Sequence, residues 1–161
     1  MHRVAQLVSH VRARVEPGEE EAARRILPPP AFEVFASMPV ADRRHALDVA
    51  ERLASAGHDD LDLLAAALLH DAAKGHRMRL WQRVAGVLLE SLAPAGLRAL
   101  ASPDPRSWRH GFHLYLQHGP MSARLAVEAG CSPRAGGFIR GEAAKRDLPL
   151  LRALKVADDA G

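Results

Sequence analysis

The chain has 161 residues, of which 48% are hydrophobic, 25% are charged and only 4% are aromatic. This length fits one domain, and a core that must be built from Ala, Leu and Val rather than from rings favours helices over strands. The 22 Lys and Arg residues outnumber the 19 Asp and Glu residues by only three. Because this surplus is small and dispersed, a nucleic-acid-binding protein is not expected, in spite of a sequence pI of about 9.6.

The single cysteine, Cys131, excludes an internal disulfide and a four-cysteine zinc site. No segment approaches the roughly 18 apolar residues of a membrane span. Near the N-terminus Ser9, His10 and Arg12 interrupt the apolar residues, so a secretory signal is not expected either. These features predict a soluble, cytoplasmic protein that does not engage a membrane.

Proline and glycine divide the chain into segments of helical length, and no strand-like alternation extends beyond a few residues. The pattern predicts an all-α, single-domain bundle over residues 39–161, preceded by an N-terminal helical arm over residues 1–38. Its first helix is expected over residues 3–15. Further helices are expected over residues 31–37, 40–56, 60–74, 79–92, 94–101, 107–116, 120–129, 133–140 and 148–159.

Three residues mark expected helix ends. Asp60 can cap the helix that follows it, and Gly75 can end that helix. Pro120 is favoured in the first turn of a helix, so a new helix is expected to begin there.

Residues 63–69 are apolar around the full circumference of a helix, and the ionisable pair His70-Asp71 follows them. A helix that is apolar on all sides is a buried one. Burying an imidazole beside a carboxylate is costly unless both are paired or bound to a metal. His70 and Asp71 are therefore candidate metal ligands, and the alternative is a hydrogen-bonded core histidine followed by a capping aspartate.

Helical geometry, at about 100° per residue, identifies further candidates. His45 shares a stripe with Val49 and Leu53 and is therefore expected to point inward, as a ligand or as a hydrogen-bonded core residue. Near the C-terminus Asp158 follows the stripe of the buried-type leucines Leu151 and Leu154. Its neighbour Asp159 falls instead on a face with Arg152 and Lys155 that is typical of solvent exposure, so Asp158 is the better ligand candidate.

His118 comes two residues before Pro120, at the expected entrance of a helix. Helical phase directs it inward, toward the face that carries Ser122. Ligand or substrate contact and a structural capping role are both open for this residue. His110 and His113 lie one turn apart, and a polar surface or groove role is favoured over a metal pair.

These segments resemble a known family. The stretches RRHALDVAERLA, AAALLHDAAKG and VADDA are similar to the H…HD…D signature of the HD-domain metal-dependent phosphohydrolase superfamily, and the likeness extends over residues 40–159. The later stretch HGPMSARLAVEAG is similar to an element of the branch that contains symmetrical diadenosine tetraphosphate hydrolases. The resemblance implies an HD-type helical bundle with His45, His70, Asp71 and Asp158 as metal ligands.

The same resemblance bears on three further side chains. His118 matches an additional ligand of a second metal site, and Lys74 matches a position near substrate phosphate. Members with two metals carry a further His in a stretch similar to AIRxHT, whereas residues 138–143 here are FIRGEA, which aligns Glu142 with that histidine. Glu142 can ligate a hard cation through oxygen or leave the second site weak or empty. Arg140 in the same stretch is one of several arginines near these motifs and is either a phosphate-binding residue or a solvated helix residue.

The implied cofactor is a divalent cation, Mn, Fe, Co, Ni, Zn or Mg. The implied reaction is cleavage of a phosphate ester or anhydride of a nucleotide or dinucleoside polyphosphate by metal-activated water, with Asp71, His118 and Lys74 as catalytic residues. The alternative is a non-catalytic HD module that binds a nucleotide or a partner protein. The sequence leaves the substrate and the oligomeric state open.

Overall fold

The structure is a computed structural model that describes residues 14–75, 78 and 80–160. The regular elements formed by the described residues are all helices, with no strand among them, which confirms the expected all-α class. The elements are α2 (Pro17–Ile26), α3 (Pro29–Ala36), α4 (Val40–Ser55), α5 (Leu61–Leu69), α6 (Leu80–Leu92), α7 (Pro94–Leu100), α8 (His110–Glu128), α9 (Pro133–Arg140), the 3-10 helix η2 (Lys145–Asp147) and α10 (Leu148–Asp159). The helix expected over residues 3–15 lies outside the described residues, apart from its last two residues, which are not helical.

Helix α2 was not among the expected helices. Pro17 occupies its first position, where the missing N–H costs nothing. The Glu19 carboxylate accepts a hydrogen bond of 2.8 Å from the backbone N–H of Glu16, as in a capping box. Ala23 of this helix is buried in the core. The start of α2 was therefore present in the sequence as a Pro-Gly-Glu-Glu pattern that is easily mistaken for a charged linker.

Helix α5 ends five residues earlier than expected. The Asp60 side chain caps its first turn by accepting from the N–H of Leu63 at 3.0 Å, as expected. After Leu69, however, the chain continues as turns over residues 70–75, with the N–H of Lys74 bonded to the carbonyl of Asp71. Gly75 has a φ of +49°, a conformation that favours glycine. The histidine and aspartate that follow α5 therefore lie at a helix end rather than within a helix.

Helix α8 corrects the expectation of two helices over residues 107–116 and 120–129. It is continuous from His110 to Glu128, with Pro120 in its interior. Proline's fixed φ is compatible with a helix, but its interior position costs one backbone hydrogen bond and crowds the carbonyl four residues earlier. Close packing of α9 on the second half of α8 helps to offset that cost: a Cβ at Gly136 would lie 2.7 Å from Val127. His118 consequently lies in the middle of a helix and not at a helix entrance.

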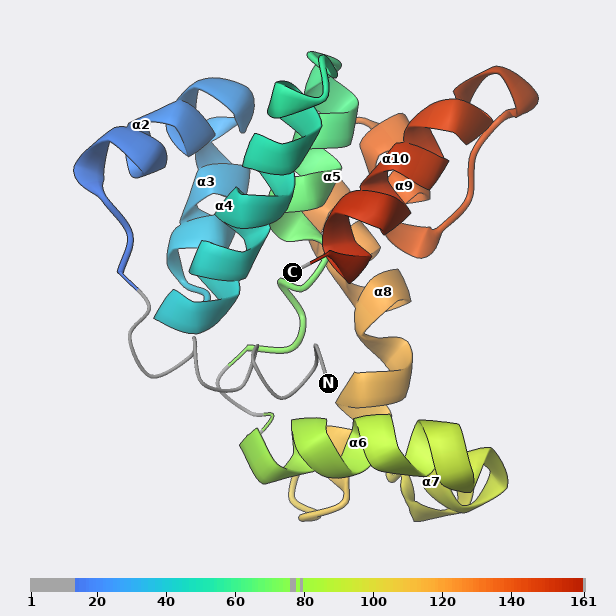
Figure 1. The fold of residues 1–161 in the computed structure, drawn as a ribbon. Helices are drawn as coiled ribbons and strands as arrows, with labels where there is room; N and C mark the ends of the chain where they lie inside the picture. Colours follow the sequence, from blue (N-terminus) through green and yellow to red (C-terminus); the bar gives the residue numbers. More distant parts are fainter. Residues whose placement is uncertain (1–13, 76–77, 79, 161) are drawn as a thin grey trace.

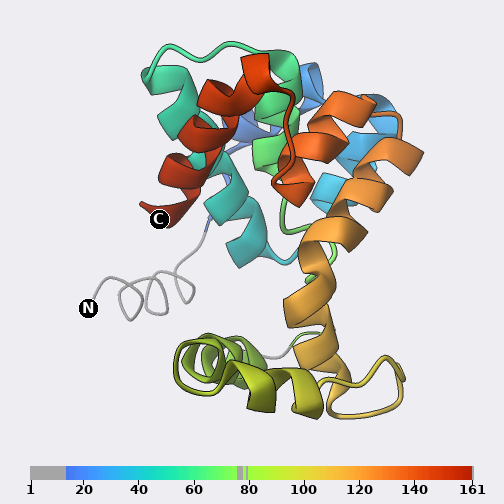
Figure 2. The same ribbon diagram turned by 90° about the vertical axis from the view of Figure 1, so that its right-hand side faces the viewer.

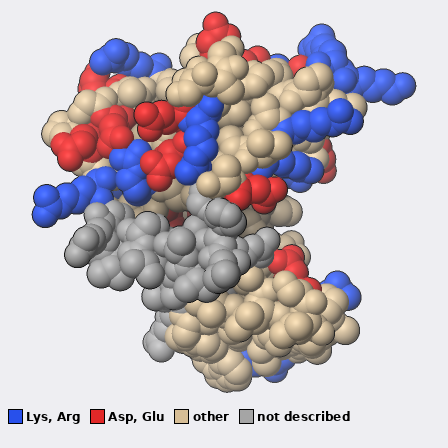
Figure 3. Space-filling model, viewed as in Figure 1, with Lys and Arg blue, Asp and Glu red and all other residues tan. Residues whose placement is uncertain are grey.

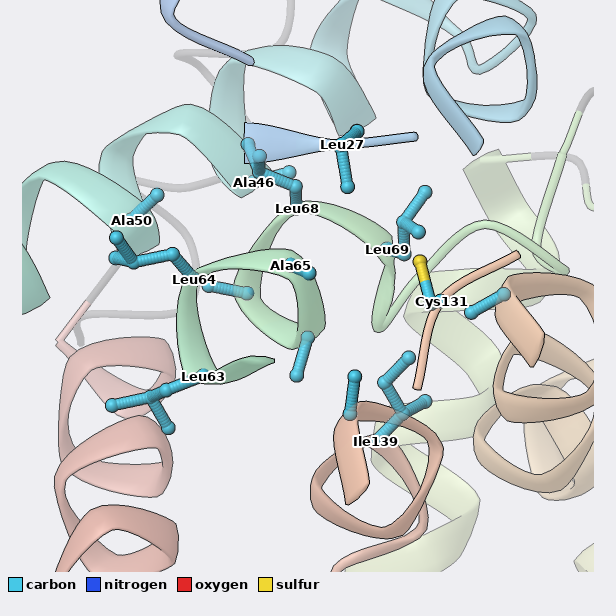
Figure 4. Close-up of a cluster of buried hydrophobic side chains, with 14 of the residues drawn as sticks. Leu27, Ala46, Ala50, Leu63, Leu64, Ala65, Leu68, Leu69, Cys131 and Ile139 are labelled. Atoms are coloured by element: carbon cyan, nitrogen blue, oxygen red, sulfur yellow. The ribbon is translucent and has the colours of Figure 1, made fainter. Parts of the chain in front are cut away.

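The main core surrounds α5, in which residues 63–69 are all buried. Figure 4 shows Leu64 and Leu68 directed toward Ala46 and Ala50 of α4. The same cluster includes side chains from α2 and α3, from α9 and from α10, namely Ala23, Phe32, Phe35, Phe138, Ile139, Leu151 and Leu154. A central apolar helix enclosed by others explains why an Ala- and Leu-rich composition is sufficient for this fold.

Helices α6 and α7 and the first half of α8 form a separate lobe beside this bundle (Figures 1 and 2). Two glycines bring α6 and α8 close together: a Cβ at Gly111 would lie 2.3 Å from Gln82, and one at Gly86 would lie 2.7 Å from Tyr115. The surface of the lobe in Figure 3 carries few charged residues. Among the described helices, none is both long enough and apolar enough to cross a membrane.

Candidate metal centre

Four elements converge where α5 ends. His45 comes from α4, His70 and Asp71 follow α5, Asp158 lies in the last turn of α10, and His118 lies in the middle of α8. The Nε2 atom of His45 is 2.9 Å from Asp158 Oδ1, and the Nε2 atom of His70 is 3.4 Å from the same oxygen. The fold thus brings together residues that lie as much as 113 positions apart in the chain.

Three of these side chains form a cluster with the dimensions of a metal site. One ligand atom each from His45, His70 and Asp158 lie within 4.8 Å of one another. Among the residues that the structure describes, this is the one group of three or more His, Cys, Asp or Glu side chains that meets this criterion. Two imidazole nitrogens and a carboxylate oxygen are donors that divalent transition metals favour.

The orientation of His70 is set by the backbone. Its Nδ1–H donates to the carbonyl of Ala67 at 2.8 Å, so in the neutral ring Nε2 carries the lone pair. Nε2 is buried and makes no hydrogen bond. A histidine that ligates a metal typically donates its other ring N–H to a carbonyl or carboxylate in this way. The ring of His70 is therefore preoriented to present a lone pair to a cation.

The electrostatics of the cluster favour positive charge at His70. Burial lowers the pKa of His70, but the carboxylates of Asp71 and Asp158 outweigh burial and raise it to about 9. Burial raises the pKa of Asp158, but its interactions with His45 and His70 outweigh burial and hold the pKa below its ordinary value. In the protein alone a proton supplies this positive charge, and a bound cation would supply it in the proton's place.

Asp71 connects the cluster to Lys74 and His118. Its side chain is only 6% exposed, and Oδ2 accepts a hydrogen bond of 2.6 Å from Lys74 Nζ and lies 3.7 Å from His70 Nε2. The other oxygen, Oδ1, is buried without a hydrogen bond, 3.7 Å from His118 Nε2. Burial raises the pKa of this carboxyl, but the charges of Lys74 and His70 outweigh burial, so Asp71 is ionised.

His118 is oriented in the same way as His70. Its Nδ1–H donates to the carbonyl of Tyr115 at 2.7 Å, which leaves a lone pair on Nε2 in the neutral ring. Burial and then the charge of Lys74 lower the pKa of His118, so the ring is neutral at pH 7. Two hydrogen-bond acceptors, His118 Nε2 and Asp71 Oδ1, therefore face each other across a short gap.

The other residues singled out in the sequence lie elsewhere. Glu142 is 68% exposed and its Oε2 accepts from Arg140 Nε at 3.0 Å, so these two side chains pair with each other and not with the cluster. Asp159 is exposed. The rings of His110 and His113, at the start of α8, stack with centroids 5.7 Å apart in the separate lobe that this half of α8 forms with α6 and α7.

Two residues that touch the site were not found from the sequence. Arg52 Nη1 donates to the carbonyl of Ala157, next to Asp158, at 3.1 Å. Ser122 Oγ accepts from the N–H of Ala73 at 3.0 Å. Arg52 lies seven residues after His45 and Ser122 lies four residues after His118, so helical spacing placed each on the correct face. Their partners are backbone atoms of distant segments, which no sequence pattern indicates.

Comparison of this chain with protein-family models, with curated proteins and with solved structures finds no match.

Proposed function

We propose that this chain is a metal-dependent phosphohydrolase that holds one divalent cation between His45, His70 and Asp158, with Asp71 beside it. The observation that carries this proposal is the buried Nε2 of His70, which makes no hydrogen bond and lies within 4.8 Å of donor atoms on His45 and Asp158. The similarity of these residues to the H…HD…D pattern of HD-domain phosphohydrolases supports the same assignment.

A single cation is proposed because the second set of ligands is incomplete. His118 has Asp71 beside it, but among the described residues no group of three donors includes His118. Glu142 is paired with Arg140 instead. One metal per chain is therefore expected, from the set Mn, Fe, Co, Ni, Zn and Mg.

A divalent cation held by His45, His70 and Asp158 would supply Lewis-acid chemistry, polarising a phosphoryl oxygen and lowering the pKa of a water molecule. The protein side chains have their own tasks in the proposed reaction. Neutral His118 accepts a proton at Nε2 from the attacking water, and the carboxylate of Asp71, 3.7 Å away, stabilises the imidazolium that forms. Lys74, held by Asp71, places a positive charge beside the phosphate group.

The proposed substrates are nucleotides and dinucleoside polyphosphates, in which water attacks phosphorus and a phosphate ester or anhydride bond breaks. This substrate class is taken from the sequence likeness to the diadenosine tetraphosphate hydrolase branch. The competing function is a non-catalytic module of the same fold that binds a nucleotide or a partner protein without turnover.

The test compares two neighbouring aspartates. Metal-depleted protein is supplied with each candidate cation and assayed for phosphate or nucleotide release on a panel of nucleotides and dinucleoside polyphosphates. Asp158→Asn should lower metal affinity and turnover by about 100-fold because it removes a ligand. Asp159→Asn, one residue away and exposed, should change neither. Protein that binds metal but hydrolyses no member of the panel would establish the non-catalytic module instead.

A further inference from the structure

Ser122 is a polar side chain in the interior of the protein, with 0% of its surface exposed. It lies on α8 one turn after His118, on the same face of that helix. Its Oγ accepts a hydrogen bond of 3.0 Å from the backbone N–H of Ala73, 49 positions away in the sequence. This bond joins α8 to the turn that follows α5.

The turn over residues 70–75 carries both Asp71 and Lys74, and Ala73 lies between them. Two backbone N–H groups in the turn donate to nearby carbonyls. The N–H of Ala72 donates to the carbonyl of Leu69, and the N–H of Lys74 donates to the carbonyl of Asp71. The N–H of Ala73 is bonded instead by the side chain of Ser122. The backbone that places Asp71 and Lys74 is thus attached directly to the helix that carries His118.

Asp71 and His118 face each other without a direct bond between their side chains. Their facing acceptor atoms are 3.7 Å apart and make no direct hydrogen bond to each other. Lys74 is hydrogen-bonded to Asp71, but no hydrogen bond joins this pair to His118, and the Ser122–Ala73 bond links the two backbone segments that carry them. Without the hydroxyl, the partly buried N–H of Ala73 loses its acceptor, which favours a rearranged turn.

We infer that Ser122 is a positioning residue that fixes Asp71 and Lys74 relative to His118. For its effect on turnover the inference rests on the proposed function, but its effect on the metal-free protein does not. Ser122 has no contact with the His45–His70–Asp158 cluster among the hydrogen bonds and ion pairs of the described residues. Its loss should therefore impair turnover more than metal binding.

The experiment compares Ser122→Ala with Ser132→Ala. Ser132 caps α9 by accepting from the N–H of Ala135 at 3.0 Å, so its loss also removes a side-chain to backbone bond, away from the site. Ser122→Cys is nearly isosteric and retains a weak acceptor. Amide exchange at Ala73 and the imidazole ¹⁵N shifts of His118 are measured by NMR without metal. Then kcat, KM and metal affinity are measured with the most active cation and nucleotide.

Ser122→Ala should accelerate exchange at Ala73 at least about tenfold and shift the His118 signals, with Ser122→Cys intermediate and Ser132→Ala unchanged. It should lower kcat by about 10- to 100-fold with KM and metal affinity within about threefold of wild type. Unchanged His118 signals, unchanged kcat, or an equal loss in Ser132→Ala would overturn the inference. If the wild type hydrolyses nothing, the proposed function fails, and the NMR comparison still decides whether Ser122 sets the geometry.

Discussion

The Nε2 atom of His70 lies in the protein interior with carboxylate oxygens of Asp158 and Asp71 at 3.4 and 3.7 Å. The Nδ1–H group donates to the Ala67 carbonyl. Nε2 therefore faces the two carboxylates either as a neutral nitrogen with a lone pair or as a nitrogen that carries positive charge. Burial of a carboxylate, here that of Asp71, is costly without such charge. These contacts favour positive charge at His70, whose pKa is raised to about 9, and we propose that a divalent cation takes this place in the loaded protein.

Lys74 supplies the other positive charge at Asp71, so replacing it should change the stability of the protein. Lys74→Met leaves a buried carboxylate without its ion-pair partner, so the metal-free protein should lose about 3 kcal/mol of unfolding free energy. A divalent cation next to Asp71 compensates for part of this loss. The rise in Tm on adding metal should therefore be larger in Lys74→Met than in wild type, as measured by thermal unfolding.

Lys155→Met serves as the control, because Lys155 is an exposed side chain on α10. It should behave as wild type with and without metal. Equal metal-induced shifts in wild type and Lys74→Met would show that the cation does not interact with Asp71.

At this scale helical spacing indicated which side chains lie together where the residues belong to regular helices. The phase of His45 and of Asp158 followed from about 100° per residue, because both belong to unbroken helices. Glu142 lies beyond Gly141, which ends α9 with a φ of +78°, so no helical phase reaches it. Ser122 and Arg52 could not be predicted as contributors, since their partners are backbone atoms 49 and 105 residues away.

At the scale of elements, the site depends on how α10 meets α4. Arg52 lies seven residues after His45, on the same face of α4, and donates to the Ala157 carbonyl at the end of α10. This bond satisfies a carbonyl in the last turn of α10, which has no partner within the helix. It also holds Asp158 beside His45.

Arg52→Ala should therefore lower metal affinity by about tenfold, as measured by competition with a metal indicator. Its cost in unfolding free energy should stay near 1 kcal/mol, because a single partly exposed hydrogen bond is lost. Arg152→Ala removes an exposed arginine from α10 itself and should leave affinity unchanged. Wild-type affinity in Arg52→Ala would mean that α10 is positioned without this contact.

Sequence patterns identified most helices but misjudged where two of them end. Local signals were reliable where they act alone, as with the Asp60 cap of α5. They failed where tertiary contacts decide. Pro120 is accommodated inside α8, and the chain leaves the helix after Leu69 although residues 70–74 have ordinary helix-forming types. In both places the deciding contacts come from other helices, which a local pattern does not contain.

At the scale of the whole molecule, Arg134 of α9 joins its own helix to the start of α5 and to η2. Its guanidinium donates to Asp60 at 2.8 Å, Asp62 at 3.1 Å and Asp147 at 2.9 Å. These carboxylates belong to the start of α5 and to η2, so the network ties the central helix to the connection before α10. Hydrogen bonds from Arg134 hold the pKa of Asp147 below its ordinary value.

This network predicts a pH dependence of stability. Because the folded pKa of Asp147 is lower than the unfolded one, near 3.8, its stabilising effect is present above about pH 4 and is lost as pH falls further. Asp147→Asn should therefore be less stable than wild type at pH 6, and the difference should shrink toward pH 3. Urea unfolding across this range measures both.

Asp59→Asn, an exposed neighbour of the network, should parallel wild type at every pH. Metal affinity should be unchanged in both variants, because neither residue is in the ligand cluster. A constant gap between wild type and Asp147→Asn down to pH 3 would contradict the assigned role of Arg134.

The proposed metal centre holds a single cation between α4, the end of α5 and α10. Anomalous diffraction at the zinc edge, from crystals grown with Zn²⁺, locates such a cation. We predict one peak, about 2.0–2.2 Å from nitrogens of His45 and His70 and from an oxygen of Asp158, that disappears in Asp158→Asn. A map without a peak among these three side chains, or with density only at another pair such as His110 and His113, would contradict the claim.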